Sequence, residues 1–142
     1  MKVLVLNGPN LNLLGRREPE IYGTASLADV EKLLQDTAPE VEFDLRQTND
    51  EGELIGWLHE AFEAKLPVIL NPAAFTHYSY ALRDACAMLT GSGVKLIEVH
   101  ISNPHAREEF RHNSVIAAVA SGVVAGFGID SYRLALLALT AD

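Results

Sequence analysis

The sequence predicts an α/β fold in which helices cover both faces of a parallel sheet. Short apolar runs of strand length alternate with amphipathic runs of helical length along the chain. Several of the short runs are apolar throughout, as in strands that are buried on both faces. Parallel neighbours require crossover connections, which are right-handed. Five such strands predict a flavodoxin-like three-layer sandwich in the order 2-1-3-4-5. With no linker or repeat, residues 1–142 are expected to form one domain.

The first strand and the loop after it organise the rest of the chain. Residues 3–6 are apolar, and at Asn7 the composition changes to Asn, Gly and Pro. The following segment has no periodicity, but interleaved leucines argue against disorder. We expect a lid over a site at about residues 10–25. Its polar side chains are Asn10, Asn12, Arg16, Arg17, Glu18, Glu20 and Tyr22.

The later elements follow in regular order. Ser26 and Asp29 have the spacing of a capping box, which predicts a helix that ends before Pro39. The last helix is apolar on much of its circumference, so it packs either on a large core face or on another subunit. Between these helices the pattern predicts an edge strand at 41–45, a helical stripe over 54–62, a strand at 67–70, a helix around 82–89, a strand at 94–99, a short helix containing Arg107 and Arg111, a strand at 122–127 and a final helix at 129–139.

The strand order predicts where a ligand binds. In open parallel sheets ligands bind at the carboxyl ends of the strands, where the order reverses, here between the first and third strands. Polar residues interrupt the apolar runs at this edge. They are Asn7 and Asn10 after strand one, Asn71 and His77 after strand three, and Glu98, His100 and Ser102 at the end of strand four.

The charge of the protein restricts the classes of molecule that it can bind. The net charge of −8 and the pI near 5.0 disfavour nucleic acid and anionic membranes. The sequence shows no signal peptide and no apolar run of about 20 residues, and its single cysteine excludes an internal disulfide, so a cytoplasmic protein is expected. Four of the seven arginines nevertheless follow strands one and four, which predicts a basic mouth for an anionic ligand. These are Arg16, Arg17, Arg107 and Arg111. The alternative is that they form solvated ion pairs with nearby glutamates.

The expected cofactors are few. No glycine-rich phosphate motif occurs, no histidines have metal-ligand spacing, and no lysine lies at the site edge to form a Schiff base, so we expect neither metal nor cofactor, although FMN stays possible. The class of catalysis that remains is acid–base catalysis by side chains. His100 is a natural acid or base, and Glu98, two residues earlier on the same sheet face, would orient it. Alternatively, His100 is a hydrogen-bonded core residue and Glu98 a surface group.

Several long motifs carry a family resemblance. NGPNLNLLGRREPEIYG, ILNPAAFTH, LRDAC, IEVHISN and AREEFRHNS together resemble the type II 3-dehydroquinate dehydratases. These enzymes of the shikimate pathway convert 3-dehydroquinate to 3-dehydroshikimate by anti elimination of water through an enolate, without metal or cofactor. The resemblance implies that Tyr22 removes the proton next to the ketone and that Arg17 favours the tyrosinate. It also implies that Asn10 holds a water against the enolate oxygen and that His100, positioned by Glu98, protonates the departing hydroxyl.

The resemblance also implies a set of binding contacts and an assembly. Asp84 is implied to reach into the site of a neighbouring subunit, within trimers of which four form a dodecamer. Ala73 stands where relatives commonly have glycine, and residues 112–115 depart from the usual pattern. The implied substrate contacts are Asn71, His77 and Arg111 to the ring hydroxyls, and Ile101 and Ser102 to the carboxylate.

Two other classes of function stay open from the residues. A non-catalytic flavodoxin-like module would explain the fold, but it would not need Tyr22, Arg17 and His100 at one edge. A different lyase or isomerase acting on another hydroxy acid would use the same site.

Overall fold

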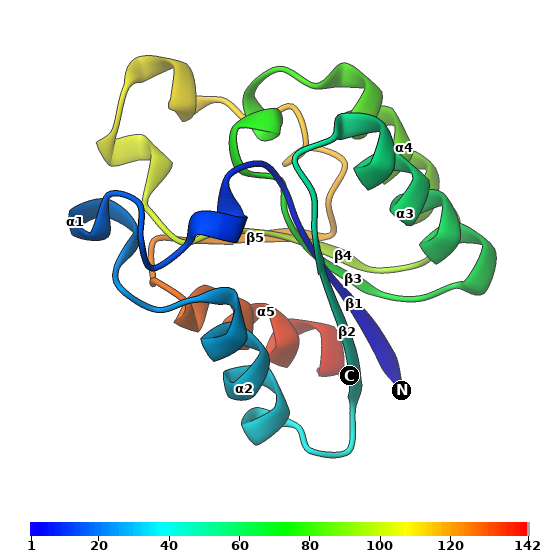
Figure 1. Cartoon of the computed structure of the whole chain (residues 1–142). Coiled ribbons are helices and arrows are strands. Elements are labelled where there is room, and N and C mark those ends of the chain that lie inside the picture. Colours follow the sequence, from blue (N-terminus) through cyan, green and yellow to red (C-terminus); the bar gives the residue numbers. More distant parts are fainter. Residues whose placement is uncertain (142) are drawn as a thin grey trace.

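The computed structural model describes residues 1–141 and shows the predicted α/β fold (Figure 1). Its parallel strands pair in the order β2-β1-β3-β4-β5, which confirms the predicted order. The order reverses between β1 and β3, where the sequence predicts the site. The strands are β1 (Lys2–Asn7), β2 (Glu42–Gln47), β3 (Val68–Asn71), β4 (Leu96–His100) and β5 (Gly122–Ala125).

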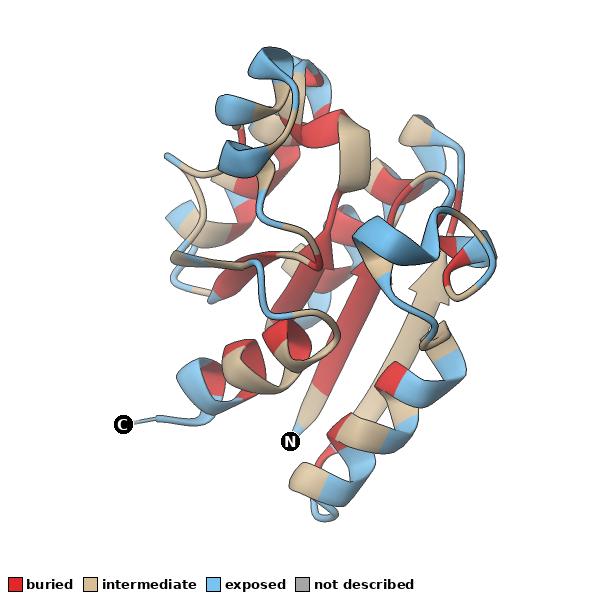
Figure 2. Cartoon of the chain, turned by 90° about the vertical axis from the view of Figure 1, so that its left-hand side faces the viewer, coloured by how far each residue is buried: buried red, intermediate tan, exposed pale blue. Residues whose placement is uncertain are grey.

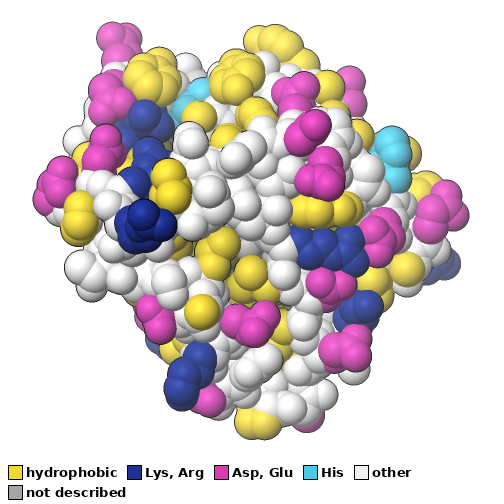
Figure 3. Space-filling model, viewed as in Figure 1, with side chains coloured by type: hydrophobic (Ala, Val, Ile, Leu, Met, Phe, Trp, Pro, Cys, Tyr) yellow, Lys and Arg dark blue, Asp and Glu magenta, His cyan; other side chains and the backbone are white. Residues whose placement is uncertain are grey.

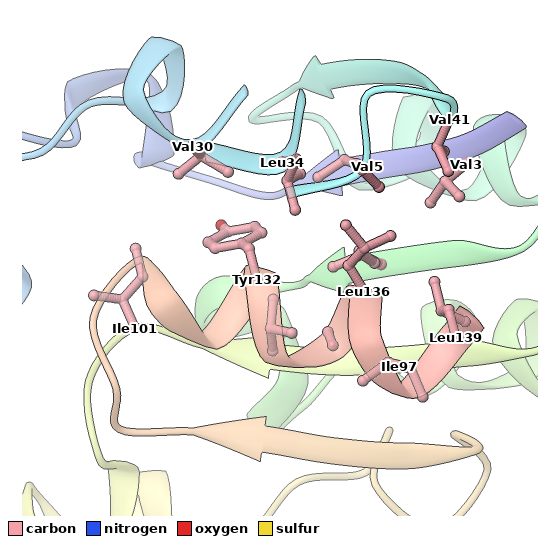
Figure 4. Close-up of a cluster of buried hydrophobic side chains, with 14 of the residues drawn as sticks. Val3, Val5, Val30, Leu34, Val41, Ile97, Ile101, Tyr132, Leu136 and Leu139 are labelled. Carbon is pink, nitrogen blue, oxygen red and sulfur yellow. The ribbon is translucent and has the colours of Figure 1, made fainter. Parts of the chain in front are cut away.

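Helices pack on both faces of the sheet, with α2 and α5 on one side and α3 and α4 on the other (Figure 1). Successive residues of β1 therefore alternate between two cores, as the period of a strand requires. In the α2/α5 core, Val5, Leu34 and Leu136 point toward one another (Figure 4). Within residues 1–141 no helix is both long and apolar enough to cross a bilayer. The main helices are α2 (Leu27–Thr37), α3 (Glu51–Ala64), α4 (Tyr80–Gly91) and α5 (Asp130–Thr140).

Several predicted boundaries change. The capping box of α2 is present, with Ser26 and Asp29 each accepting from the other's backbone N–H. The fourth strand extends to His100, and β5 ends at Ala125 because Gly126 has a φ of 95°. The predicted short helix after β4 is instead a pair of 3₁₀ turns, η3 (Pro104–Ala106) and η4 (Glu109–His112). The buried residues of α5 pack on the core, in line with the first of the two predicted alternatives.

A buried polar network joins α5 to the tips of the two strands at the reversal point. The Tyr132 hydroxyl is fully buried, donates to Asn7 Oδ1 at 2.7 Å and accepts from Asn71 Nδ2 at 2.9 Å. Burial raises the pKa of Tyr132 well above the usual range, so the phenol stays protonated. Asn71 Oδ1 accepts from the Ala73 N–H at 3.1 Å. The network therefore fixes which way both amides point.

Ala73 adopts a backbone conformation that favours glycine. Its φ is 51°, in the left-handed region. This conformation costs a non-glycine residue about 1–2 kcal/mol. The hydrogen bond of its N–H to Asn71 and the start of η2 (Ala73–His77) hold it there.

We expect Ala73→Gly to raise the free energy of unfolding by about 0.5–1 kcal/mol. The left-handed penalty disappears, and the greater entropy of glycine in the unfolded chain offsets part of the gain. Urea unfolding of Ala73→Gly and of the neighbouring control Ala74→Gly measures the effect. The control lacks a positive φ and should be destabilised. Equal destabilisation of both variants would contradict the expectation.

Candidate active site

A cavity of about 110 Å³ opens at the carboxyl ends of the strands, over the reversal point between β1 and β3. Figure 2 shows the central strands buried, whereas much of the chain beyond their ends is half-buried or exposed. Side chains from the lid and from the segments after β1, β3 and β4 line the cavity. They are Pro9, Asn10, Leu11, Arg17, Tyr22, Asn71, Ala73, Ala74, His77, His100, Ile101, Ser102, Pro104, Arg107 and Arg111.

The predicted lid contains two short helices, η1 (Leu11–Leu13) and α1 (Pro19–Tyr22). Leu11 and Leu14 are buried in the core and anchor its first half, whereas α1 buries no residue. Asn10 has a left-handed φ of 71°, and its N–H donates to Asn49 Oδ1 at 2.9 Å. The lid is thus fixed to the body at one end and packed loosely over the cavity at the other.

Two guanidinium groups contact the ring of Tyr22. Arg17 Nη2 donates to the Tyr22 hydroxyl at 3.2 Å, and the Arg17 Cζ lies 4.3 Å from the ring centroid. Arg107 Cζ lies 5.1 Å from the same centroid. Both guanidinium groups thus contact the face of the ring, and Arg17 also contacts its oxygen. Figure 3 shows Lys and Arg side chains gathered on the side where α1 and η4 lie, with acidic side chains around them.

Arg107 lines the cavity, although no individual role was predicted for it. Its Nη1 donates to Ser102 Oγ at 3.1 Å, so it joins the turn after β4 to the lid tyrosine. Its Nε is buried and has no acceptor within the described residues. The only sequence signal was its place among the arginines after strand four. Which of those arginines faces the lid depends on the path of η3 and η4.

Glu98 and His100 form a close pair at the end of β4. Glu98 is fully buried and its Oε2 lies 2.5 Å from His100 Nε2, so the carboxylate is not a surface group. Burial raises the pKa of Glu98, but hydrogen bonds from His100, Thr76 and Ser114 outweigh it and hold the pKa below its usual range. Glu98 does not line the main cavity. It lies behind His100, on a second cavity of about 250 Å³.

The three side chains predicted to contact the ring hydroxyls, Asn71, His77 and Arg111, line the main cavity. Burial lowers the pKa of His77, and its Nδ1 donates to the Asn113 carbonyl at 2.9 Å, which leaves Nε2 of the neutral ring as an acceptor. Arg111 Nε pairs with Glu108 at 2.5 Å, so the ion-pair alternative holds for this arginine. Asn71 keeps one amide N–H beyond its bond to Tyr132.

The turn after β4 presents backbone donors. Ile101 and Ser102 line the cavity directly after the strand. Asn103 caps η3, with its Oδ1 accepting from the His105 N–H at 3.1 Å, and Pro104 occupies the first position of the turn.

Two predicted or considered residues lie away from the cavity of their own chain. Asp84 is an exposed residue of α4 and pairs with Arg83 at 2.9 Å. Arg16 is exposed on the lid and is not among the lining residues. In the part of the chain that the structure describes, no group of three or more His, Cys, Asp or Glu side chains is placed to hold a metal ion.

Known proteins with similar sequence and structure share one description. The model of the family described as dehydroquinase class II matches residues 1–140. A 3-dehydroquinate dehydratase of Salinispora tropica is 58% identical over 99% of this chain and 98% of its own, and one of Kineococcus radiotolerans is 60% identical over 96% and 92%. The crystal structure of type II dehydroquinase from Propionibacterium acnes matches with a TM-score of 0.93 and 48% identity over 99% of this chain and 97% of its own. The chain therefore belongs to the class II dehydroquinase family, as its motifs predicted.

Proposed function

We propose that this protein is a 3-dehydroquinate dehydratase of the shikimate pathway, which eliminates water in the anti sense through an enolate to give 3-dehydroshikimate. Membership of the family and relatives named 3-dehydroquinate dehydratase support the dehydration. The observation that carries the mechanism is that the Arg17–Tyr22 pair and His100 line the same cavity. A base and an acid on one small cavity are what stepwise loss of a proton and a hydroxyl requires.

In the first step Tyr22, as the phenolate, takes the proton from the carbon next to the ketone. The C–H electron pair moves toward the carbonyl and gives the enolate. Arg17, and now Arg107 as well, stabilise the phenolate by their positive charge. Asn10 holds a water against the enolate oxygen, where negative charge develops.

In the second step the enolate collapses to the ketone. Its C=C electron pair forms the new double bond, and the carbon–oxygen bond to the hydroxyl breaks. His100 gives its proton to the departing oxygen, which leaves as water. Glu98, buried behind the ring, orients the imidazole and balances its positive charge. The proton on Tyr22 and the proton missing from His100 are then exchanged with solvent to complete the cycle.

Substrate recognition uses the rest of the cavity. The backbone N–H groups of Ile101 and Ser102, with the Ser102 hydroxyl, hold the carboxylate. Three side chains contact the ring hydroxyls, with the neutral His77 accepting through Nε2. The lid at residues 10–25 closes over the bound substrate and excludes water, which strengthens the charge–charge interactions inside. The residues for the ring hydroxyls are Asn71, His77 and Arg111.

The proposed assembly completes the site. Asp84, exposed on α4, reaches the substrate of a neighbouring subunit within a trimer, and four trimers form a dodecamer. Residues 1–142 form the single catalytic domain, in the cytoplasm. No metal, cofactor, nucleic acid or membrane takes part.

The proposal predicts turnover of 3-dehydroquinate by the purified protein, followed by the absorbance of the conjugated enone product. The rate should be insensitive to EDTA and to borohydride, because the proposed chemistry uses protein acids and bases and no Schiff base. Substrate-dependent inactivation by borohydride, or loss of activity with EDTA, would contradict the mechanism. Absence of turnover would contradict the function itself.

A further inference from the structure

Two hydroxyl groups contact the buried carboxylate that lies behind His100. Thr76 Oγ1 is 2.6 Å from Glu98 Oε2, and Ser114 Oγ is 3.0 Å from both carboxylate oxygens. Thr76 is itself 1% exposed. The two residues belong to separate segments, η2 and the stretch after η4, which the hydrogen bond from the Val115 N–H to the Thr76 carbonyl holds together at 2.7 Å. The position of both hydroxyls is therefore fixed by the backbone.

The direction of the hydrogen bond from Thr76 is also fixed. The backbone N–H groups of Ile116 and Ala117 donate to Ser114 Oγ at 3.1 and 3.0 Å, which fills both lone pairs of that oxygen. The Thr76 proton therefore cannot go to Ser114, although the two oxygens are 2.6 Å apart, and it points to Glu98. The Ser114 proton is shared between Glu98 and Thr76 Oγ1, so Ser114 supports the carboxylate both directly and through Thr76. Hydrogen bonds donated to a carboxylate favour its ionised form.

We propose that Thr76 and Ser114 are positioning residues for the acid step, because they keep Glu98 ionised and so decide which ring nitrogen of His100 carries the catalytic proton. An ionised Glu98 makes His100 Nε2 a donor to it. The remaining nitrogen, Nδ1, has no partner within residues 1–141 and is the one that can serve the substrate. This inference rests on the proposed role of His100 as the acid.

If the hydroxyls were absent, the buried carboxylate would bind a proton more readily, since hydrogen bonds to the charged form lower a carboxyl pKa and burial raises it. If Glu98 were protonated, the proton between Glu98 Oε2 and His100 Nε2 would lie on the carboxyl and not on the imidazole. The other titratable or charged side chains around the pair come from η2, α4, η3 and η4. They are His77, Cys86, His105, Arg111 and His112.

The test compares isosteric variants of the hydroxyls. Thr76→Val and Ser114→Ala should each lower kcat for 3-dehydroquinate about tenfold, change KM less than twofold, and move the acid limb of kcat to higher pH. Thr76→Ser keeps the hydroxyl, so its kcat and the acid limb of its pH profile should match those of the wild type. Thr90→Val is the control, because Thr90 loses an equivalent hydroxyl that donates to the Val119 carbonyl at 2.7 Å and does not contact Glu98.

A second measurement needs no variant of the hydroxyls and no activity. Nitrogen-15 NMR of the histidine rings at alkaline pH, with His100 assigned by its loss in His100→Gln, should show the neutral His100 protonated at Nε2. Protonation at Nδ1 would overturn the proposal even if a variant fails to fold. So would a kcat and acid limb in Thr76→Val within twofold of the wild type. Absence of turnover in the wild type would instead refute the proposed function and leave the NMR result to be judged separately.

Discussion

Replacing Tyr22 by phenylalanine should lower kcat about a hundredfold or more, while the fold, the assembly and the KM stay close to those of the wild type. The substitution removes one oxygen, which accepts from Arg17 at 3.2 Å. The ring keeps its contacts with both guanidinium groups, because those contacts are to its face. Steady-state kinetics with 3-dehydroquinate, together with circular dichroism and sedimentation, measures the three quantities.

Tyr80→Phe is the matched control for this variant. Tyr80 is 70% exposed at the start of α4, so the same loss of a hydroxyl should leave kcat within twofold. If Tyr22→Phe kept more than about a tenth of the rate, the base would have to be another group, since the loss of a general base costs at least about a hundredfold.

Replacing His100 by glutamine should lower kcat about a hundred- to a thousandfold without loss of stability. The glutamine amide nitrogen can occupy the position of the ring Nε2, 2.5 Å from Glu98, and donate to the carboxylate as the ring does. It cannot release a proton to a leaving hydroxyl. The expected loss corresponds to about 3–4 kcal/mol in the barrier, the size of one positioned acid.

His100→Ala separates the chemical role from the structural one. It removes the donor to a fully buried carboxylate, which should lower the free energy of unfolding by about 1–3 kcal/mol at neutral pH. The pKa of Glu98 lies below its ordinary value of 4.5 in the folded protein, so its stabilising contribution is present above 4.5 and is lost as the pH falls below it. The stability difference between His100→Ala and the wild type should therefore shrink below about pH 4.5.

Two outcomes would contradict this account of His100. If His100→Gln retained more than a tenth of kcat, the proton for the leaving group would have to come from another residue. An alanine variant as stable as the wild type, measured by urea unfolding at neutral pH, would mean that the other donors alone satisfy Glu98.

The order of the strands and most of the lining residues follow from sequence because they depend on local patterns. A run such as residues 3–6 is buried on both faces, and right-handed crossovers leave few orders for five parallel strands. The polar residue that ends each run then lies at the same edge. This is why Asn10, Asn71 and His100 could be assigned to one cavity before the structure was known.

The contacts between distant segments could not be predicted in this way. Thr76 and Ser114 are separated by 38 residues, and neither has a local pattern that points to Glu98. The same holds for Arg107, whose position over Tyr22 depends on how two 3₁₀ turns bend the chain. Short 3₁₀ turns lack the long periodicity that reveals an α-helix, so the sequence pattern suggested one short helix where two turns exist.

The hydroxyl of Tyr132 has a consequence for how the protein is made. It comes from the final helix, yet it is the partner of both buried amides that end the two strands beneath the cavity. A growing polypeptide on the ribosome has the lid and the first four strands long before it has this residue. Until residue 132 is synthesised and docks, the amides of Asn7 and Asn71 lack their partner, so the floor of the cavity forms only after α5 has packed on the sheet.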